Sequence, residues 1–156
     1  MFKKRYIIFI AIIITVFFSL NIFAESDFNL KLTDDSGEIL INIPVKVGSE
    51  FIVTFVHSSE LEPWDNLFEV SENGEMILRE IRVPSTGPGV PSVLPDDWEF
   101  EIKDGYFIYD SVDKKYKTID YIVSSISPHY LIINDEKINL VELTENWAKI
   151  RFELGK

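Results

Sequence analysis

Hydrophobic and polar side chains alternate along most of the chain after residue 25. The alternation is clearest in residues 28–32, 39–45, 51–55, 98–102 and 148–154. Because successive side chains of a β-strand point to opposite faces of a sheet, a period of two predicts strands with one buried face and one wet face. No window of useful length has the period of 3.6 that an amphipathic helix requires.

Turn signals lie between these alternating runs. Residues 34–37, 73–74, 104–105 and 134–135 are rich in Asp, Asn and Gly, which tolerate the positive φ angles of tight hairpins. Short strands joined by such turns predict an all-β domain. We expect an antiparallel β-sandwich or flattened barrel of about nine to eleven short strands.

Two stretches interrupt the alternation. Residues 84–97 contain four prolines and two glycines, so they cannot form a central strand and are expected to be a long, stiff loop. Loops longer than ~12 residues are uncommon inside a compact domain and often carry function. Residues 58–66, which include Pro63 and Trp64, are predicted to be a second irregular stretch.

The N-terminus has the pattern of an export signal. A basic cluster in residues 1–5 precedes an apolar run over 6–20, and the sequence turns polar after Ala24. This pattern predicts a hydrophobic helix in residues 1–24, which is either a signal peptide cut after Ala24 or an uncleaved membrane anchor. In both cases the domain of residues 25–156 lies in the periplasm or on the outer face of the cytoplasmic membrane of a bacterium. No cysteine lies near the cleavage point, which excludes a lipoprotein.

Charge and cysteine content exclude several classes of function. The 156-residue chain has 15 basic and 26 acidic residues, and residues 1–24 contain three of the basic ones and no acid. The remaining twelve basic and 26 acidic residues give the domain a net charge near −14, which repels nucleic acid and anionic lipid. The absence of cysteine excludes a disulfide, a thiol nucleophile and a thiolate metal site.

The chain has two histidines. His57 continues the inward register of Phe55 where its strand ends, so it is either a structural histidine or a ligand contact beside the proline-rich loop. His129 follows Pro128 and is predicted to be a turn residue. Ser58 and His57 are neighbours on a strand and point to opposite faces, so they cannot form a nucleophile–base pair.

Metal ligands and aromatic platforms are the other candidate chemistry. The acids near His57 match no defined metal-binding loop, so we expect no metal and no cofactor. Trp98 is predicted to be a core residue, and Trp147 is predicted to face outward or to cap an edge. Trp64 is the best candidate for an exposed aromatic residue, either as a sugar-stacking platform or in a packing role.

Two blocks of sequence resemble the domain-of-unknown-function 1850 family. Residues 51–70 are a strand ending in His-Ser, then an acidic spacer, a proline and an aromatic strand, and residues 85–91 read Ser-Thr-Gly-Pro-Gly-Val-Pro. The sequence departs from the family pattern at Asn66, where an acid is common, and at Pro88, which lies between the two glycines. The resemblance implies a small exported or membrane-anchored protein of unknown activity. Such proteins are often encoded beside tripartite ATP-independent periplasmic (TRAP-type) transporters with a TAXI solute-binding subunit.

These observations lead to one main hypothesis and two alternatives. We expect an extracytoplasmic binding or accessory protein, associated with a TRAP-type solute transporter and touching the membrane only through its N-terminal segment. The alternatives are an exported ester or glycan hydrolase with His57 as general base, and a passive structural envelope protein. We expect no catalytic residues under the main hypothesis, and we predict that the His57 strand end and residues 87–91 lie side by side. The candidate ligand-binding residues are His57, Ser58, Glu60, Trp64, Asp65, Gly87 and Gly89.

Overall fold

The computed structural model describes residues 27–57, 61–85, 90 and 93–156, and the regular secondary structure of this part is all β-strand except for one short 3-10 helix. The hydrophobic helix and cleavage point predicted for residues 1–24 lie outside the described residues. In the described part, no helix is long and apolar enough to cross a membrane. The elements are β1 (Phe28–Asp34), β2 (Ile39–Val45), β3 (Glu50–Val56), β4 (Pro63–Val70), β5 (Met76–Val83), β6 (Glu99–Lys103), β7 (Tyr106–Asp110), β8 (Lys114–Tyr116), β9 (Thr118–Val123), β10 (His129–Ile133), β11 (Glu136–Asn139), the 3-10 helix η1 (Leu140–Leu143) and β12 (Ala148–Gly155).

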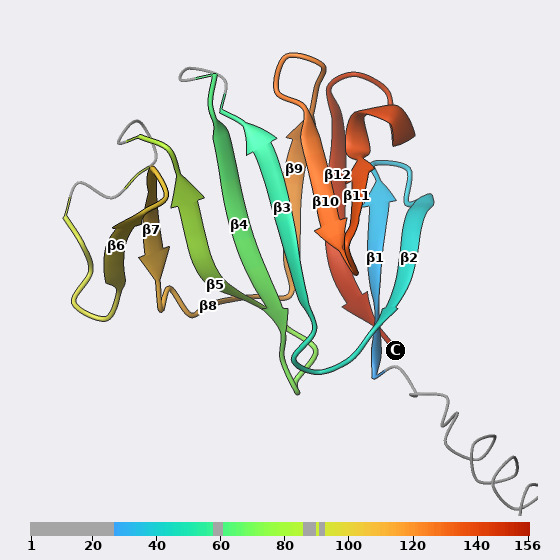
Figure 1. Cartoon of the computed structure of the whole chain (residues 1–156). Coiled ribbons are helices and arrows are strands. Elements are labelled where there is room, and N and C mark those ends of the chain that lie inside the picture. Colours follow the sequence, from blue (N-terminus) through green and yellow to red (C-terminus); the bar gives the residue numbers. More distant parts are fainter. Residues whose placement is uncertain (1–26, 58–60, 86–89, 91–92) are drawn as a thin grey trace, which may run out of the picture.

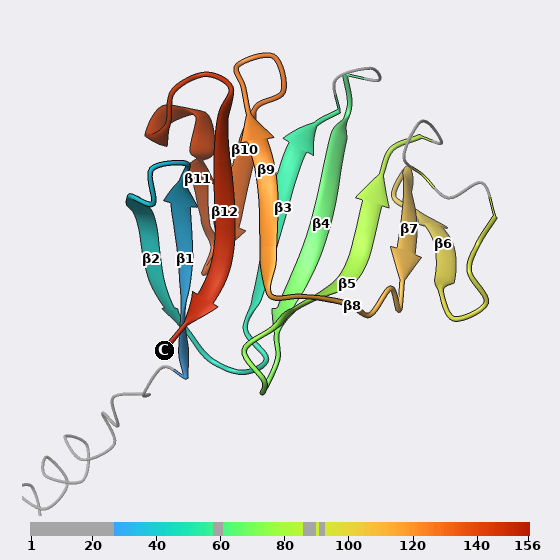
Figure 2. The same ribbon diagram turned by 180° about the vertical axis from the view of Figure 1, so that it is seen from behind.

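The strands form two antiparallel sheets (Figure 1). The small sheet has the order β2-β1-β12-β9, and the large sheet has the order β11-β10-β3-β4-β5-β7-β6, with β8 paired to β5. The prediction of an all-β antiparallel sandwich is therefore confirmed. The sandwich is open, because the large sheet extends past the small one through β5, β7 and β6 (Figures 1 and 2). The twelve strands of the described residues slightly exceed the nine to eleven expected.

The core lies where the two sheets face each other. Phe51 of β3 stacks on Phe68 of β4 with ring centroids 5.2 Å apart, and on Phe152 of β12 at 6.3 Å. Leu30 and Leu32 of β1 are fully buried, as their alternation with polar residues predicts. Burial of such apolar surface is the main stabilising contribution to a sandwich of this kind.

The predicted turns are confirmed by their backbone angles. Asn134 and Asp135 have φ angles of 51° and 64° in the β10–β11 turn. Asp104 and Gly105 have φ angles of 53° and 84° in the β6–β7 turn. Two consecutive positive φ angles are what a two-residue hairpin turn needs to match the twist of its strands.

Two strand predictions need correction. Residues 58–66 are not irregular throughout, because β4 begins at Pro63; a proline is tolerated as the first residue of a strand. The alternation over residues 98–102 predicts a half-buried strand, but all five residues of β6 are exposed, and Ile102 is 65% exposed. β6 is the last strand of the large sheet and lies beyond the small sheet, which explains its exposure (Figure 2).

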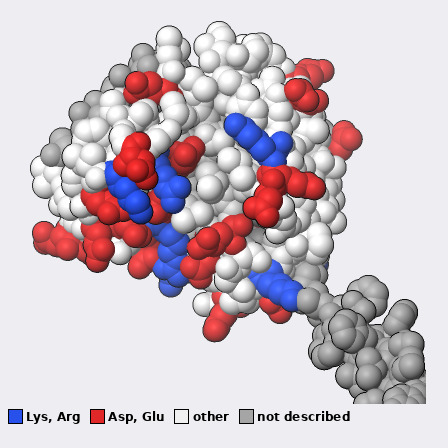
Figure 3. Space-filling view, in the orientation of Figure 1, with Lys and Arg blue, Asp and Glu red and all other residues white. Residues whose placement is uncertain are grey.

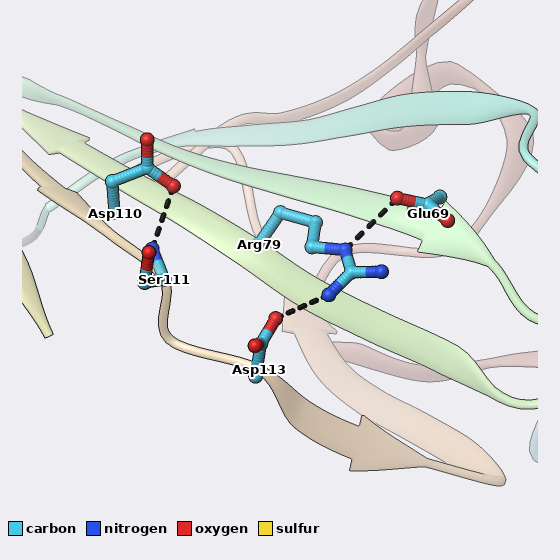
Figure 4. Close-up of polar contacts among 5 residues, drawn as sticks. All are labelled: Glu69, Arg79, Asp110, Ser111 and Asp113. Carbon is cyan, nitrogen blue, oxygen red and sulfur yellow. Dashed lines mark hydrogen bonds and ion pairs between the residues drawn. The ribbon is translucent and has the colours of Figure 1, made fainter. Parts of the chain in front are cut away.

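Arg79 of β5 holds three segments of the extended half of the large sheet together (Figure 4). Its Nε donates to Glu69 Oε2 of β4 at 2.9 Å, and its Nη1 donates to Asp113, between β7 and β8. In the same turn, Ser111 N donates to Asp110 Oδ1 at 2.6 Å. The Glu69 and Asp113 carboxylates raise the pKa of Arg79, which is fully charged.

The two ends of the sandwich differ in what they carry. The described chain begins and ends at one of them, where Asn29 pairs with Gly155 (Figure 1). The β3–β4 and β9–β10 connections, the start of the β5–β6 connection and the segment between η1 and β12 lie at the other end. We call this second end the distal end.

Candidate functional site

His57 follows β3 directly and ends a row of stacked rings at the distal end. Its ring lies on that of Trp64 at 5.6 Å with an interplanar angle of 24°. Trp64 stacks on Phe55 at 6.0 Å, and Phe55 stacks on His129 at 5.1 Å, each with an angle of 16°. We call these four side chains the ring row.

Strand register explains why the ring row forms. Phe55 of β3 pairs with Trp64 of β4 on one side and with His129 of β10 on the other. Side chains of directly paired residues lie on the same face of a sheet, close enough to stack. The stacking of His57 on Trp64 agrees with the prediction that His57 continues the inward register of Phe55.

Tyr121 of β9 meets the ring row from the small sheet. Its ring lies edge-on to His129 at 5.3 Å and tilted against Phe55 at 6.1 Å. Asn66 Nδ2 donates to the Tyr121 hydroxyl at 3.2 Å, and Trp64 Nε1 donates to Asn66 Oδ1 at 3.0 Å. Burial raises the pKa of Tyr121 to about 12, so its hydroxyl keeps its proton at neutral pH.

The prediction that His129 is a turn residue is wrong. His129 is the first residue of β10 and only 5% exposed. Its Nδ1 lies 2.7 Å from the carbonyl oxygen of Ser127, so Nδ1 carries the proton and donates it. Burial lowers the pKa of His129, so the ring is neutral at neutral pH. This histidine is a structural member of the ring row.

The β3–β4 connection is closed by backbone hydrogen bonds and touches the proline-rich segment. His57 N donates to the Glu62 carbonyl, and Leu61 N donates to the His57 carbonyl, both at 2.8 Å. Ser85 Oγ donates to Glu62 Oε2 at 2.8 Å. The beginning of residues 84–97 therefore lies against this connection, and Val90 packs at the edge of the core.

Four of the seven predicted ligand-binding residues lie outside the described residues: Ser58, Glu60, Gly87 and Gly89. Residues 87–91 are described only at Val90, so their predicted position beside the His57 strand end stays a prediction. The structure does bring His57 and Trp64 together.

Asp65 does not join His57 and Trp64. It follows Trp64 on β4 and therefore points to the opposite face of the large sheet, where it is in register with Arg82 of β5 and Thr54 of β3. The prediction placed Asp65 in the same site because residues near in sequence were expected to share an irregular loop. The early start of β4 separates them.

The three tryptophans differ in exposure. Trp64 is half-buried between Phe55 and His57, so the expectation that its ring is exposed is wrong, and of the two roles considered it has the packing role. Trp98 is buried and Trp147 is 60% exposed, as predicted. An indole packed on both sides stabilises the site and leaves the His57 end of the row as its accessible part.

Tyr121 and Asn66 are the site residues that the sequence did not reveal. Tyr121 lies two residues from both Ile119 and Val123, so the three side chains share a face of the strand, which indicates an inward-facing position. Its contact with the ring row depends on the packing of one sheet on the other. Within the described ranges, no group of three or more His, Asp or Glu residues could hold a metal ion.

The sequence model of one protein family, Domain of unknown function (DUF1850), matches residues 51–140. The chain belongs to this family. The match runs from β3 to the start of η1 and includes the whole ring row, Tyr121 and residues 84–97. No curated protein and no solved structure matches the chain. The DUF1850 segment therefore coincides with the strands that build the site, whereas β1, β2 and β12 of the small sheet lie outside it.

Proposed function

We propose that this protein is an extracytoplasmic binding or accessory module that binds through the distal end of its large sheet, around His57. The observation that supports this most strongly is the ring row. Three rings packed behind one another hold the His57 imidazole in a defined position at the end of a strand. Binding sites need side chains held in this way by rigid elements.

The groups beside His57 suggest the chemistry of what binds there. The Glu62 carboxylate is oriented by Ser85, and the backbone between His57 and Glu62 is closed by hydrogen bonds. An imidazole and a carboxylate on two residues joined by a backbone hydrogen bond suit a polar ligand or protein segment with hydrogen-bond donors or a positive charge. The net negative charge of the chain disfavours anionic ligands.

A TRAP-type transporter is the partner that we propose for this module. The proposal is supported by the export pattern of residues 1–24 and by the two sequence blocks that resemble a family often encoded beside such transporters. The distal end lies opposite the end where the described chain begins, so it is available to a neighbouring protein when the N-terminus is attached to a membrane (Figure 1).

Co-purification with the membrane subunits of the transporter tests both proposals. We expect the tagged full-length protein to retain these subunits after detergent solubilisation, and His57→Ala to lower retention by about tenfold, equivalent to ~1.4 kcal/mol. Lys115→Ala, an exposed change on β8, is the matched control and should retain the subunits.

Different outcomes would contradict the proposed binding surface and the proposed partner. Full retention by a correctly folded His57→Ala protein would show that the distal end around His57 is not the binding surface. Failure of the unmodified protein to retain the subunits would reject the transporter as partner. We expect the His57→Ala variant to fold, because His57 is only half-buried, and thermal unfolding measures this.

A further inference from the structure

Trp147 is held in solvent by an unusual backbone conformation. It lies just before β12 with a φ angle of 69°. A positive φ angle is sterically strained for a bulky residue. Two hydrogen bonds hold this backbone: Trp147 N donates to the Val123 carbonyl at 2.8 Å, and Ala148 N donates to the Glu145 carbonyl at 3.1 Å. The fold therefore displays a large aromatic side chain to water at a cost in stability.

Other apolar side chains are exposed on the segments next to Trp147. Ile126 in the β9–β10 connection is 61% exposed, and Ile122 on β9 is 60% exposed. Leu143, the last residue of η1, is also exposed. We call Ile122, Ile126, Leu143 and Trp147 the Trp147 surface.

The segments that carry these side chains are fixed to one another. Ser125 N donates to Asn146 Oδ1 at 2.9 Å, which joins the β9–β10 connection to the segment before β12. The Trp147–Val123 backbone bond adds a second link between the same segments. The exposed apolar groups thus belong to a defined surface, and such clusters usually mark interaction sites.

Acidic groups are exposed on the η1 side of the Trp147 surface. Glu142 and Glu145 are exposed in the segment that carries Leu143 and Trp147. On the β9 side, Lys149 is in register with Ile122, and both Lys149 and Arg151 form ion pairs of 2.7 Å with Asp120. Figure 3 views the molecule from the large sheet; its upper edge is largely uncharged, with acidic groups at the upper right and a basic group just below this edge. An apolar centre with an acidic border along η1 is complementary to apolar side chains accompanied by Lys or Arg.

The net charge of the whole chain indicates which partners could bind this surface. Two copies of this acidic chain would repel each other, and the chain would also be repelled by anionic lipid headgroups. We infer that the Trp147 surface docks a different protein, whose contact surface combines apolar side chains with Lys or Arg. The inference uses no residue of the ring row, so it goes beyond the proposed function and does not depend on it.

Site-specific photo-cross-linking in intact cells identifies the occupant. A benzophenone amino acid in place of Trp147 in the full-length chain is expected to cross-link to another protein, at a segment with apolar residues and Lys or Arg. The control position is Ile102, which is similarly exposed but lies on β6, the last strand of the large sheet; it should not cross-link to that protein. A cross-link to a second copy of this chain, to lipid or to a segment without basic residues would overturn the inference, as would no specific cross-link.

Trp147→Asn tests the same inference with purified proteins. Asparagine tolerates positive φ, so the variant should fold with a thermal midpoint equal to or above that of the unmodified protein. It should bind the cross-linked partner at least about tenfold more weakly, with Ile102→Ser unchanged. Undiminished binding by Trp147→Asn would contradict the inference. A large loss of stability would do so too, because it would assign Trp147 a structural role.

Discussion

The two histidines of the ring row have the same side chain but different environments. His129 is buried against Phe55 of the large sheet and Tyr121 of the small sheet, and it donates from Nδ1 to the Ser127 carbonyl. His57 lies at the end of the row, half-buried, where the strand meets the loops. One position suits a neutral structural ring and the other suits a group that contacts a partner. Burial, rather than residue type, separates the two roles.

At the scale of single residues, His129 makes stability depend on pH. Burial lowers its pKa below the ordinary value of 6.5, so the unfolded chain takes up a proton at a higher pH than the folded chain. The stability contributed by neutral His129 is therefore present above pH 6.5 and is lost as the pH falls below this value. Urea unfolding should show a free energy of unfolding that decreases between about pH 7.5 and about pH 5.

The control is His129→Gln, which cannot titrate in this range but keeps an N–H donor. Its free energy of unfolding should fall less steeply over the same interval than that of the unmodified protein. Equal slopes for the two proteins would contradict the assignment of this pH dependence to His129.

At the scale of elements, the strands that contribute to the site come from both sheets. β3, β4 and β10 supply the ring row, and β9 of the small sheet supplies Tyr121. The Asn66–Tyr121 hydrogen bond joins β4 to β9 across the sandwich. The position of His57 therefore depends on how the sheets pack as well as on its own strand.

Tyr121→Phe tests this link between the sheets. The substitution keeps the ring but removes the oxygen that accepts from Asn66 Nδ2, so we expect a loss of about 1 kcal/mol in the free energy of unfolding. Urea unfolding at neutral pH measures it. Tyr130→Phe is the matched control. The ring of residue 130 keeps its contact with Lys137 Nζ, which lies 4.3 Å from the ring centroid, so the free energy of unfolding should change little. A Tyr121→Phe protein as stable as this control would show that the hydrogen bond contributes nothing.

At the scale of the whole molecule, the start of the described chain and the proposed contact surfaces lie at opposite ends. The described chain begins at the end where β1 and β12 meet, whereas the ring row and the Trp147 surface lie at the distal end (Figures 1 and 2). The acidic surface keeps the domain away from anionic lipid. This arrangement suits a domain that projects from a membrane or diffuses beside it.

The mass of the protein isolated from outside the cytoplasm tests how it is attached. The pattern of residues 1–24 predicts cleavage after Ala24, so the mature chain should begin at Glu25. Mass spectrometry of the intact protein measures this directly. A chain that retains residues 1–24 would instead be membrane-anchored, and it should then remain with the membrane fraction in high salt.

The sequence alone determined the fold class and much of the strand pattern. The inward positions of Leu30 and Phe51 and the turns at residues 104–105 and 134–135 follow from local rules, because alternation and positive φ depend on neighbouring residues. The prediction of an exposed Trp147 also follows from its place in the alternation.

Only the tertiary structure decided which side chains make the site. Phe55 meets His129, and Asn66 meets Tyr121 across 55 residues of sequence, because strand order and sheet packing bring them together. Asp65 leaves the predicted site for a complementary reason: once β4 begins at Pro63, its side chain must face away from that of Trp64. Local periodicity specifies which face a residue is on, and long-range pairing specifies its neighbours on that face.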